Sequence, residues 1–514
     1  MFFALGDFLV IDYIRKILDA RVYDVAVHTP LDPMIRMSQR LNSSVLLKRE
    51  DLQPIFSFKI RGAYNLISRL SNEEKRSGVI CASAGNHAQG VALSSQKLGI
   101  KAIIVMPITT PSIKIEAVQY FGAEIVLHGD TFDEAYSHAR KLEKEKGLKF
   151  IHPYDDPDVI AGQGTVGLEI LQQYPGPIEA VFIPIGGGGL AAGVASYIKF
   201  LRPEIKLIGV EPSDAASMKE AISAGKRVIL DRVGLFADGV AVRQAGEETF
   251  RICKELLDDV LVANTDEICA AVKDIFEDMR VIAEPAGALS LAGLKSYTTQ
   301  NPERTGALIA INSGANMNFD RLRHVAERAE IGESREILLG VTIPEKPGSY
   351  LKFVQTLGNK IITEFNYRYA TDKRAHVFVG LKLKGSHSEK EKVISELESL
   401  GYEVLDISAN ETAKIHIRYM VGGRVSELKE EIIFRCEFPE RPGALLKFLE
   451  SVGTNWNITL FHYRNHGADY GRVLVGFQVP TSDREGFREK LKSLGYPYEE
   501  ETDNPAYKMF LHSA

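Results

Sequence analysis

Between residues 45 and 311, short runs of β-branched and apolar residues alternate with stretches of helical periodicity. The runs read VLLK, GVICASA, KAIIVMP, AEIVLHG, AVFIPIG, KLIGVEP, DVLVANT and GALIAIN. This alternation is typical of parallel strands joined by crossover helices. The segments between them space apolar residues three and four positions apart, as at Ala135, Ala139 and Leu142, so that one helix face packs on a sheet. The sequence therefore predicts an α/β fold here.

The C-terminal third of the chain contains an internal repeat. The matched blocks are PEKPGSYLKFVQTLG from Pro344 with PERPGALLKFLESVG from Pro439, FNYR from Phe365 with FHYR from Phe461, and LESLGY from Leu397 with LKSLGY from Leu491. The offsets are 95, 96 and 94 residues and the order is kept, which indicates two copies of one unit. Each copy reads strand, Pro-Gly turn, helix, strand, strand, helix, strand, which predicts a ferredoxin-like βαββαβ fold.

The length of 514 residues suggests roughly three domains at about 150 residues each. The charged segment AERAEIGESRE, residues 326–336, is typical of a linker or an exposed helix end. We therefore predict an N-terminal unit over 1–330, a linker over 331–336, repeat units over 337–410 and 432–514, and a connector over 411–431.

Composition excludes several classes of protein. There are 62 basic and 68 acidic residues, a formal charge of −6, and no basic run suited to nucleic acid. The four cysteines form no CxxC pair, which argues against a zinc site or a disulfide framework and favours a reducing cytoplasm.

Two apolar segments of the chain resemble an export signal or a membrane-spanning helix, but we expect neither. The N-terminus is interrupted by Asp7 and Asp12 and lacks a basic leader, so we expect a helix there and no export signal. Residues 180–198 carry no charge, but Pro184 and four consecutive glycines would break a spanning helix. We expect a buried strand, a loop and a helix.

Lys59 lies in SFKIRGA, among the uncharged residues Ser57, Phe58 and Ile60. A single lysine is usually a solvated surface charge. Desolvation, or the neighbouring charge of Arg61, would lower the pKa of this amine and make it a nucleophile for a carbonyl carbon.

The loop SAGNHAQG, Ser83 to Gly90, follows one predicted strand and begins a helix. Free backbone N–H groups at such a position suit an anion such as a carboxylate, with Asn86 and His87 as polar handles. The alternative is a tight turn in which Asn86 caps the helix.

Two further loops follow predicted strands. GGGGL, Gly186 to Leu190, allows the backbone to wrap a phosphate. Gly187, Gly189 and Ala192 also satisfy GxGxxA, with Glu211 at a later strand end, so a dinucleotide remains an alternative ligand. INSGAN, Ile311 to Asn316, places Ser313 after another strand, and we expect these loops to share one rim of an open sheet.

These motifs together resemble the tryptophan synthase β-like, fold type II family of pyridoxal 5′-phosphate enzymes. Within it, SFKIRGAY, SAGNHAQG, GGGGLAAG and EPAGA (Glu284 to Ala288), followed by a doubled C-terminal unit, are similar to the biosynthetic threonine deaminases. The resemblance implies a catalytic domain with two open, mainly parallel sheets and two ACT-like α+β regulatory subdomains.

The resemblance also implies residue roles. Lys59 would bind the cofactor covalently and act as the base, and Ser313 would meet the pyridine nitrogen. The other residues implied to contact the cofactor are Phe58, Asn86 at the 3-oxygen, and Gly186, Gly187, Gly188, Gly189 and Leu190 at the phosphate. Those implied to bind the substrate carboxylate are Ser83, Ala84, Gly85, Asn86 and His87. No metal is implied.

The reaction that the resemblance implies is deamination of L-threonine, and more weakly of L-serine, to a 2-oxo acid and ammonia. Serine racemases of the family carry a second serine where this chain has Ala84, so elimination without racemisation is expected. Isoleucine and valine are the implied effectors of a homotetramer.

The sequence leaves three alternative functions open. One is a catabolic serine/threonine dehydratase, against which the doubled unit speaks. Another is threonine synthase, against which SAGNHAQG and EPAGA speak. The third is an amino-acid or nucleotide sensor without catalysis, which would be colourless. The C-terminal pair could also serve only as an oligomer interface.

Overall fold

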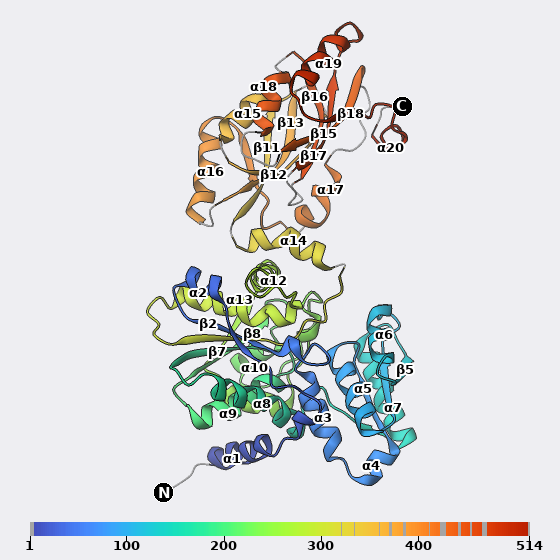
Figure 1. Cartoon of the computed structure of the whole chain (residues 1–514), viewed down its shortest axis with the longest axis vertical. Helices are drawn as coiled ribbons and strands as arrows, with labels where there is room; N and C mark the ends of the chain where they lie inside the picture. The colour runs from blue at the N-terminus through green and yellow to red at the C-terminus, as the bar shows by residue number, and fades with distance from the viewer. Residues whose placement is uncertain are drawn as a thin grey trace. The chain divides into compact units, whose positions relative to one another are not determined.

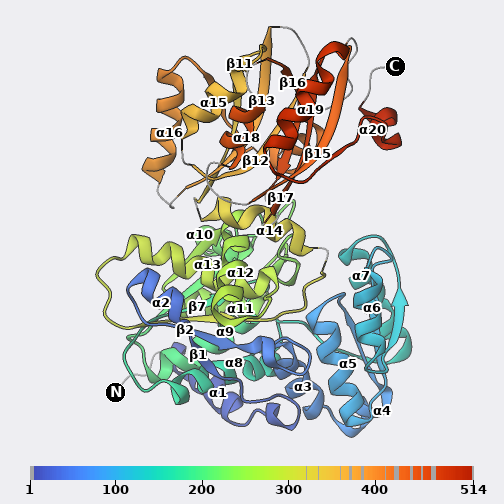
Figure 2. The same cartoon turned by 45° about the horizontal axis from the view of Figure 1, so that its top comes forward.

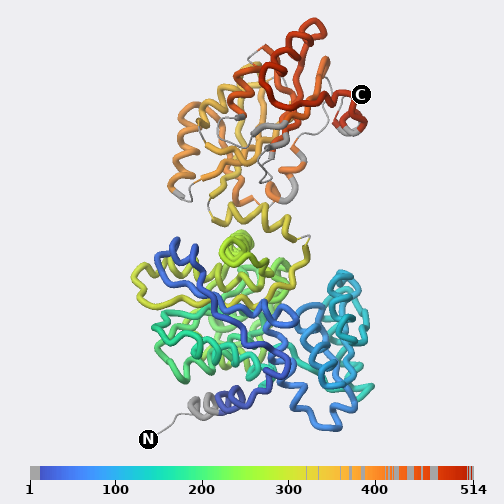
Figure 3. The backbone as a smooth tube through the Cα atoms, in the orientation of Figure 1, coloured from blue at the N-terminus to red at the C-terminus, as the bar shows by residue number. Residues whose placement is uncertain are grey.

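The computed structural model describes residues 5–319, 321–333, 335–358, 360–369, 373–383, 387–410, 412–421, 428–439, 444–452, 455–464 and 470–511. The chain divides into two units, Met1–Gly332 and Glu333–Ala514 (Figure 3). Each unit has its own sheets and its own hydrophobic core.

A six-stranded sheet forms the centre of the first unit. Its strands, in spatial order, are β1 (Leu31–Pro33), β2 (Val45–Arg49), β10 (Ala307–Asn312), β7 (Ile178–Pro184), β8 (Lys206–Pro212) and β9 (Asp259–Ala263). All neighbours are parallel except β1, which pairs antiparallel with β2. Strands buried on both faces read as continuous apolar runs, which is why the sequence revealed β2, β7, β8 and β10.

A second, four-stranded parallel sheet forms a smaller lobe of the same unit (Figure 1). Its order is β5 (Glu124–Leu127), β4 (Ala102–Met106), β3 (Val79–Ala82) and β6 (Lys149–Phe150). The expectation that the polar loops share the rim of one sheet is therefore wrong. The loop after β3 belongs to this small sheet, whereas those after β7 and β10 belong to the larger one, because alternation along the chain does not determine which strands pair.

Helices cover these sheets, and some of them begin at recognisable side-chain caps. Thr131 with Glu134, and Asn264 with Glu267, form capping boxes, and Asp156 caps the helix that starts at Pro157. The helices are α1 (Leu5–Leu18), α2 (Ile35–Leu41), α3 (Lys59–Arg69), α4 (Asn72–Ser77), α5 (Asn86–Leu98), α6 (Ser112–Gln119), α7 (Phe132–Lys146), α8 (Pro157–Gln173), α9 (Gly189–Leu201), α10 (Ser217–Ala224), α11 (Glu247–Leu256), α12 (Thr265–Met279), α13 (Pro285–Gln300) and α14 (Arg321–Gly332).

The two apolar segments of the sequence fold as expected. The N-terminal segment forms α1 from Leu5, and the uncharged stretch is β7, the glycine loop and α9. Across the described ranges, no helix is both long and apolar enough to cross a bilayer.

The second unit confirms the repeat. One copy consists of β11 (Glu336–Pro344), α15 (Ser349–Leu357), β12 (Ile362–Arg368), β13 (Arg374–Lys382), α16 (His387–Ser399) and β14 (Glu403–Asp406). The other consists of β15 (Glu431–Pro439), α18 (Ala444–Val452), β16 (Asn457–Arg464), β17 (Tyr470–Gln478), α19 (Arg484–Ser493) and β18 (Tyr498–Glu500). The second predicted Pro-Gly turn, at 440–443, and residues 422–427 of the predicted connector lie outside the described residues.

The two copies join into one antiparallel sheet of order β14-β11-β13-β12-β16-β17-β15-β18. The repeated motifs meet at its centre, where Phe365 lies opposite Tyr463 and Tyr367 opposite Phe461, on either side of the pair Asn366 and His462. This pairing maps one copy onto the other by a local twofold axis.

One face of this sheet and the four helices of the repeat share a single core (Figure 2). The core takes alternate residues of the strands, such as Val377 and Val379, and helix residues such as Phe353 and Phe487. Fusion of the two copies therefore gives a core that neither copy has alone.

We predict that Phe461→Ala destabilises the second unit by about 3–5 kcal/mol, the usual cost of deleting a buried aromatic ring. Phe461 is 1% exposed and meets the ring of Phe365 at 5.4 Å. Trp456, the single tryptophan of the chain, lies in this unit, so urea unfolding followed by its fluorescence measures the change. Leu405→Ala, at a 65% exposed leucine of the same unit, is the control. Equal midpoints for the two variants would contradict this packing.

Candidate functional site

Lys59 is the first residue of α3, and the segment before it is bound to the end of β10. The Phe58 N–H donates to the carbonyl oxygen of Ser313 at 3.2 Å, and Ser57 forms an isolated antiparallel bridge with Gly314. The predicted lysine and the predicted serine, 254 positions apart, are thereby held next to each other.

The Lys59 amine lies in a dry environment. Its Nζ donates to the Pro153 carbonyl oxygen at 2.8 Å and lies 5.3 Å from the centre of the Phe58 ring. Burial lowers the pKa of this amine to about 8, while the carboxylate of Glu284 acts in the opposite direction. A neutral, nucleophilic form is therefore accessible near physiological pH.

Arg61 does not take the role that the sequence suggested for it. Its guanidinium is fully buried and donates to Glu50 at 2.7 Å and to Glu169 at 2.6 Å, so two carboxylates neutralise its charge. Desolvation, and not Arg61, lowers the pKa of Lys59. The ion cluster instead anchors the first turn of α3 to η2 (Glu50–Leu52) and α8.

Asn86 begins α5 and is fixed by two side-chain hydrogen bonds. Its Nδ2 donates to Glu284 Oε1 at 2.7 Å, and its Oδ1 accepts from Asn316 Nδ2 at 2.7 Å. Burial and nearby Asp238 raise the pKa of Glu284 to about 7. The second hydrogen on Asn86 Nδ2 remains for a ligand.

The ring of His87 is engaged within the protein. Its Nε2 lies 2.9 Å from the Ile151 carbonyl oxygen, which can only accept, so Nε2 carries the hydrogen. Burial and the nearby Lys59 lower the pKa of His87 to about 3, so the ring is neutral. The expected handles on a carboxylate are thus the backbone of this loop and the Ser83 hydroxyl.

Both ligand loops present unpaired donors at helix N-termini. In α5, the first N–H group that donates to a backbone carbonyl is that of Gln89, and its acceptor is the Gly85 carbonyl oxygen. In α9, the first is that of Ala192, which donates to the Gly188 carbonyl oxygen. Among the described residues, the N–H groups of Asn86, His87 and the segment 186–190 donate to no backbone carbonyl. Such donors, together with the helix dipole, favour anions.

The glycines of the second loop are required by its geometry. Gly188 has a φ of +95°, and a Cβ on Gly187 would lie 2.3 Å from the Tyr154 ring. Thr249 Oγ1 donates to the Gly187 carbonyl at 2.6 Å, which turns the peptide so that its N–H side stays open. Tyr154 and Thr249 carried no motif in the sequence.

Ser313 is buried, and its hydroxyl donates weakly to the Ala286 carbonyl oxygen at 3.3 Å. If the ligand were a dinucleotide, Glu211 would be the acidic residue that binds its ribose. Its two carboxylate oxygens instead accept the backbone N–H groups of Met218 and Lys219, each at 2.8 Å. Glu211 therefore fixes the start of α10 and is 0% exposed, so it is not accessible to a ribose.

The candidate site residues thus come together from both lobes, and Glu284 and Asn316 join them. Glu284 was part of the EPAGA motif and Asn316 of INSGAN, but nothing in either motif identified them as partners of Asn86. Pairings of this kind depend on the fold and leave no signal in one sequence.

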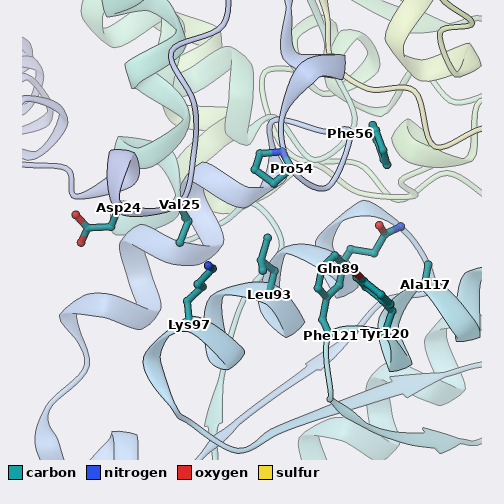
Figure 4. Close-up of a pocket in the computed structure, with 10 residues that line it drawn as sticks. All are labelled: Asp24, Val25, Pro54, Phe56, Gln89, Leu93, Lys97, Ala117, Tyr120 and Phe121. Carbon is teal, nitrogen blue, oxygen red and sulfur yellow. The ribbon is translucent and has the colours of Figure 1, made fainter.

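A cavity of about 590 Å³ is lined by other residues of this unit (Figure 4). Pro54 and Phe56 form one wall, and Gln89, Leu93 and Tyr120 form the facing wall. Its lining includes none of Lys59, Asn86, the glycine loop or Ser313, so it is not the site described above.

The fold and site define a two-lobed α/β protein with a half-buried lysine and two helix N-termini whose N–H groups are unpaired. Residues 23–313 match the family of pyridoxal-phosphate dependent enzymes, and 327–417 and 422–511 each match the C-terminal regulatory domain of threonine dehydratase. A biosynthetic L-threonine dehydratase of Burkholderia multivorans is 55% identical over 97% of this chain and 99% of its own length. That of Escherichia coli is 54% identical over 97% of each chain.

Solved structures agree with this. The processed threonine deaminase isoform 2 of Solanum lycopersicum is 52% identical, with a TM-score of 0.61, over 62% of this chain and 93% of that one. Maize serine racemase is 33% identical, with a TM-score of 0.58, over 62% and 96%. The chain belongs to the pyridoxal-phosphate dependent enzymes and, within them, to the threonine dehydratases that carry a C-terminal regulatory domain.

The residues present fit this cofactor. An aldehyde needs a nucleophilic amine, and desolvation lowers the pKa of the half-buried Lys59. A phosphate needs convergent N–H donors, and the loop 186–190 supplies them at the start of α9. The polar atoms of a pyridine ring need hydrogen-bonding partners, and the Asn86 amide and the Ser313 hydroxyl are groups of that kind.

We predict that the apoprotein takes up pyridoxal 5′-phosphate with a pH dependence centred near pH 8, the lowered pKa of Lys59. Only the neutral amine attacks an aldehyde, so the rate should rise about tenfold per pH unit below this value and level off above it. The growth of the visible absorption band after mixing measures the rate. A rate still climbing at pH 10 would mean that Lys59 is an ordinary solvated lysine.

Proposed function

We propose that this chain catalyses the deamination of L-threonine to 2-oxobutanoate and ammonia, with L-serine as a slower substrate. The observation that carries the proposal is the half-buried, desolvated Lys59 amine in a unit that also presents two sets of unpaired helix N–H groups. The high identity to biosynthetic threonine dehydratases, along almost the whole chain, supports the choice of substrate.

Pyridoxal 5′-phosphate supplies an electron sink that stabilises negative charge at the substrate Cα. Lys59 would hold its aldehyde carbon, Phe58 would pack beside that bond, Asn86 Nδ2 would donate to the 3-oxygen, and the loop 186–190 would hold the phosphate. Ser313 would meet the ring nitrogen through a hydroxyl, which is neutral and does not keep that nitrogen protonated. A weaker sink favours loss of a β-substituent over other outcomes.

The reaction needs one base and a place for the carboxylate. Lys59 Nζ, once free, removes the Cα proton, for which its lowered pKa suits it at neutral pH. In the Ser83 to His87 loop, the N–H groups of Ser83 and Gly85 already donate to Val105 O and Ser83 Oγ, so those of Ala84, Asn86 and His87 hold the carboxylate. The β-hydroxyl leaves as water. The released enamine isomerises to an imine, and the imine adds one water to yield the 2-oxo acid and ammonia.

We predict that Lys59→Ala abolishes both threonine deamination and the visible absorption band of the bound cofactor. Lys97→Ala, at a lysine that lines the separate cavity, is the matched control and should keep both. A 2-oxo acid assay and an absorption spectrum suffice. A Lys59→Ala protein that stays yellow and active would contradict the assignment.

We predict pyruvate, but no D-serine, from L-serine. Racemisation needs an acid on the cofactor face opposite Lys59, and Ala84 has no hydroxyl to serve as one. Chiral chromatography of the reaction mixture measures both products. Accumulation of D-serine at a rate comparable to that of pyruvate would overturn this reading.

We assign the reaction to residues 1–330 and its control to the subdomains at 337–410 and 432–514, with isoleucine as inhibitor and valine as its antagonist. The regulatory-domain matches and the fused core of the repeat support this. We further propose that the enzyme is a cytoplasmic homotetramer. Titration of activity with isoleucine, with and without valine, tests the effectors, and light scattering tests the assembly.

A further inference from the structure

Residues 238–240 form a single 3-10 turn, η3 (Asp238–Val240), that touches both sides of the cofactor site. A Cβ on Gly239 would lie 3.4 Å from Glu284 Oε1 and 3.9 Å from Asn86 Nδ2. A Cβ on Gly186 would lie 3.0 Å from the Cα of Val240. The backbone of η3 therefore lies so close to Asn86, Glu284 and the glycine loop that one added carbon would reach them.

Asp238 ties this turn to two distant elements. Its Oδ2 accepts from Lys114 Nζ of α6, in the small lobe, at 2.5 Å. Its Oδ1 accepts from Arg321 Nη1 of α14 at 3.2 Å, and the same nitrogen donates to the Phe236 carbonyl oxygen at 2.8 Å. Arg321 thus holds both Asp238 and the backbone that leads into η3.

Helix α14 is the last helix of the first unit, and the chain continues from it directly into the second. Val325 and Ala329 of α14 pack in the same core as Ile268 and Val272 of α12. The helix ends at Gly332, and β11 of the regulatory unit begins at Glu336. Three residues of chain, 333–335, therefore join the helix that carries Arg321 to the first strand of the regulatory unit.

We propose that Asp238 is a positioning residue that links α14, through Arg321, to Asn86 and the glycine loop, and thereby transmits the state of the regulatory unit to the cofactor site. The proposal rests on the function proposed above. In energetic terms, the Arg321 contact carries part of the coupling free energy between effector and substrate sites.

The test compares Arg321→Gln with Arg323→Gln. Arg323 lies on the same helix, is largely exposed and pairs with Glu327 one turn away on that helix. Isoleucine inhibition is measured by the 2-oxo acid assay, and isoleucine binding by the fluorescence of Trp456, which reports only on the regulatory unit. We expect the half-inhibiting isoleucine concentration to rise at least tenfold in Arg321→Gln, with binding within twofold of wild type, and no change in Arg323→Gln.

Asp238→Asn removes the other partner of the Arg321–Asp238 ion pair. It serves as a second variant in case Arg321→Gln has a folding defect. It should reproduce the loss of inhibition while retaining isoleucine binding. Wild-type inhibition in both variants would overturn the proposal, and so would loss of isoleucine binding, which would mean that these residues only support the fold. Wild-type protein that deaminates threonine but ignores isoleucine would overturn it while leaving the catalytic function intact. Wild-type protein that leaves threonine unchanged would refute the proposed function itself.

Discussion

The short connection between the segment before α3 and the end of β10 determines the geometry of the site. The Phe58 N–H to Ser313 contact and the Ser57 bridge to Gly314 fix the position of Lys59 relative to Ser313. Arg61, buried between Glu50 and Glu169, holds the same helical turn from the other side. The lysine side chain is long and flexible, but its amine is held in a defined position because the backbone that carries it is fixed.

Desolvation and backbone donors explain how a chain of net charge −6 binds small anions. The two ligand loops begin α5 and α9, where N–H groups lack a backbone acceptor among the described residues. The fold fixes the direction of these N–H groups, and dissolved salt screens them less than it screens charges on mobile surface side chains. The same dryness that lowers the pKa of Lys59 also keeps His87 neutral and raises the pKa of Glu284.

The sequence predicts a good part of this architecture. The eight β-branched runs are strands β2, β3, β4, β5, β7, β8, β9 and β10. Six of them are buried parallel strands, which leave a continuous apolar signal, whereas the edge strands β5 and β9 are partly exposed. The repeat predicts both βαββαβ copies, though not that FNYR and FHYR would pair across a twofold axis. The sequence could not divide the strands between two sheets, nor assign Arg61 to an ion cluster, nor find the Asn86, Glu284 and Asn316 network, because each depends on contacts between segments far apart in the chain.

The central claim is that Lys59 is the residue that binds the cofactor. Borohydride reduction of the yellow protein converts a lysine–pyridoxal bond to a stable amine, and proteolysis with mass spectrometry then locates it. We predict one phosphopyridoxyl group per chain, on the peptide that contains Lys59. A label on another lysine, or a label scattered over surface lysines, would contradict this account of the site.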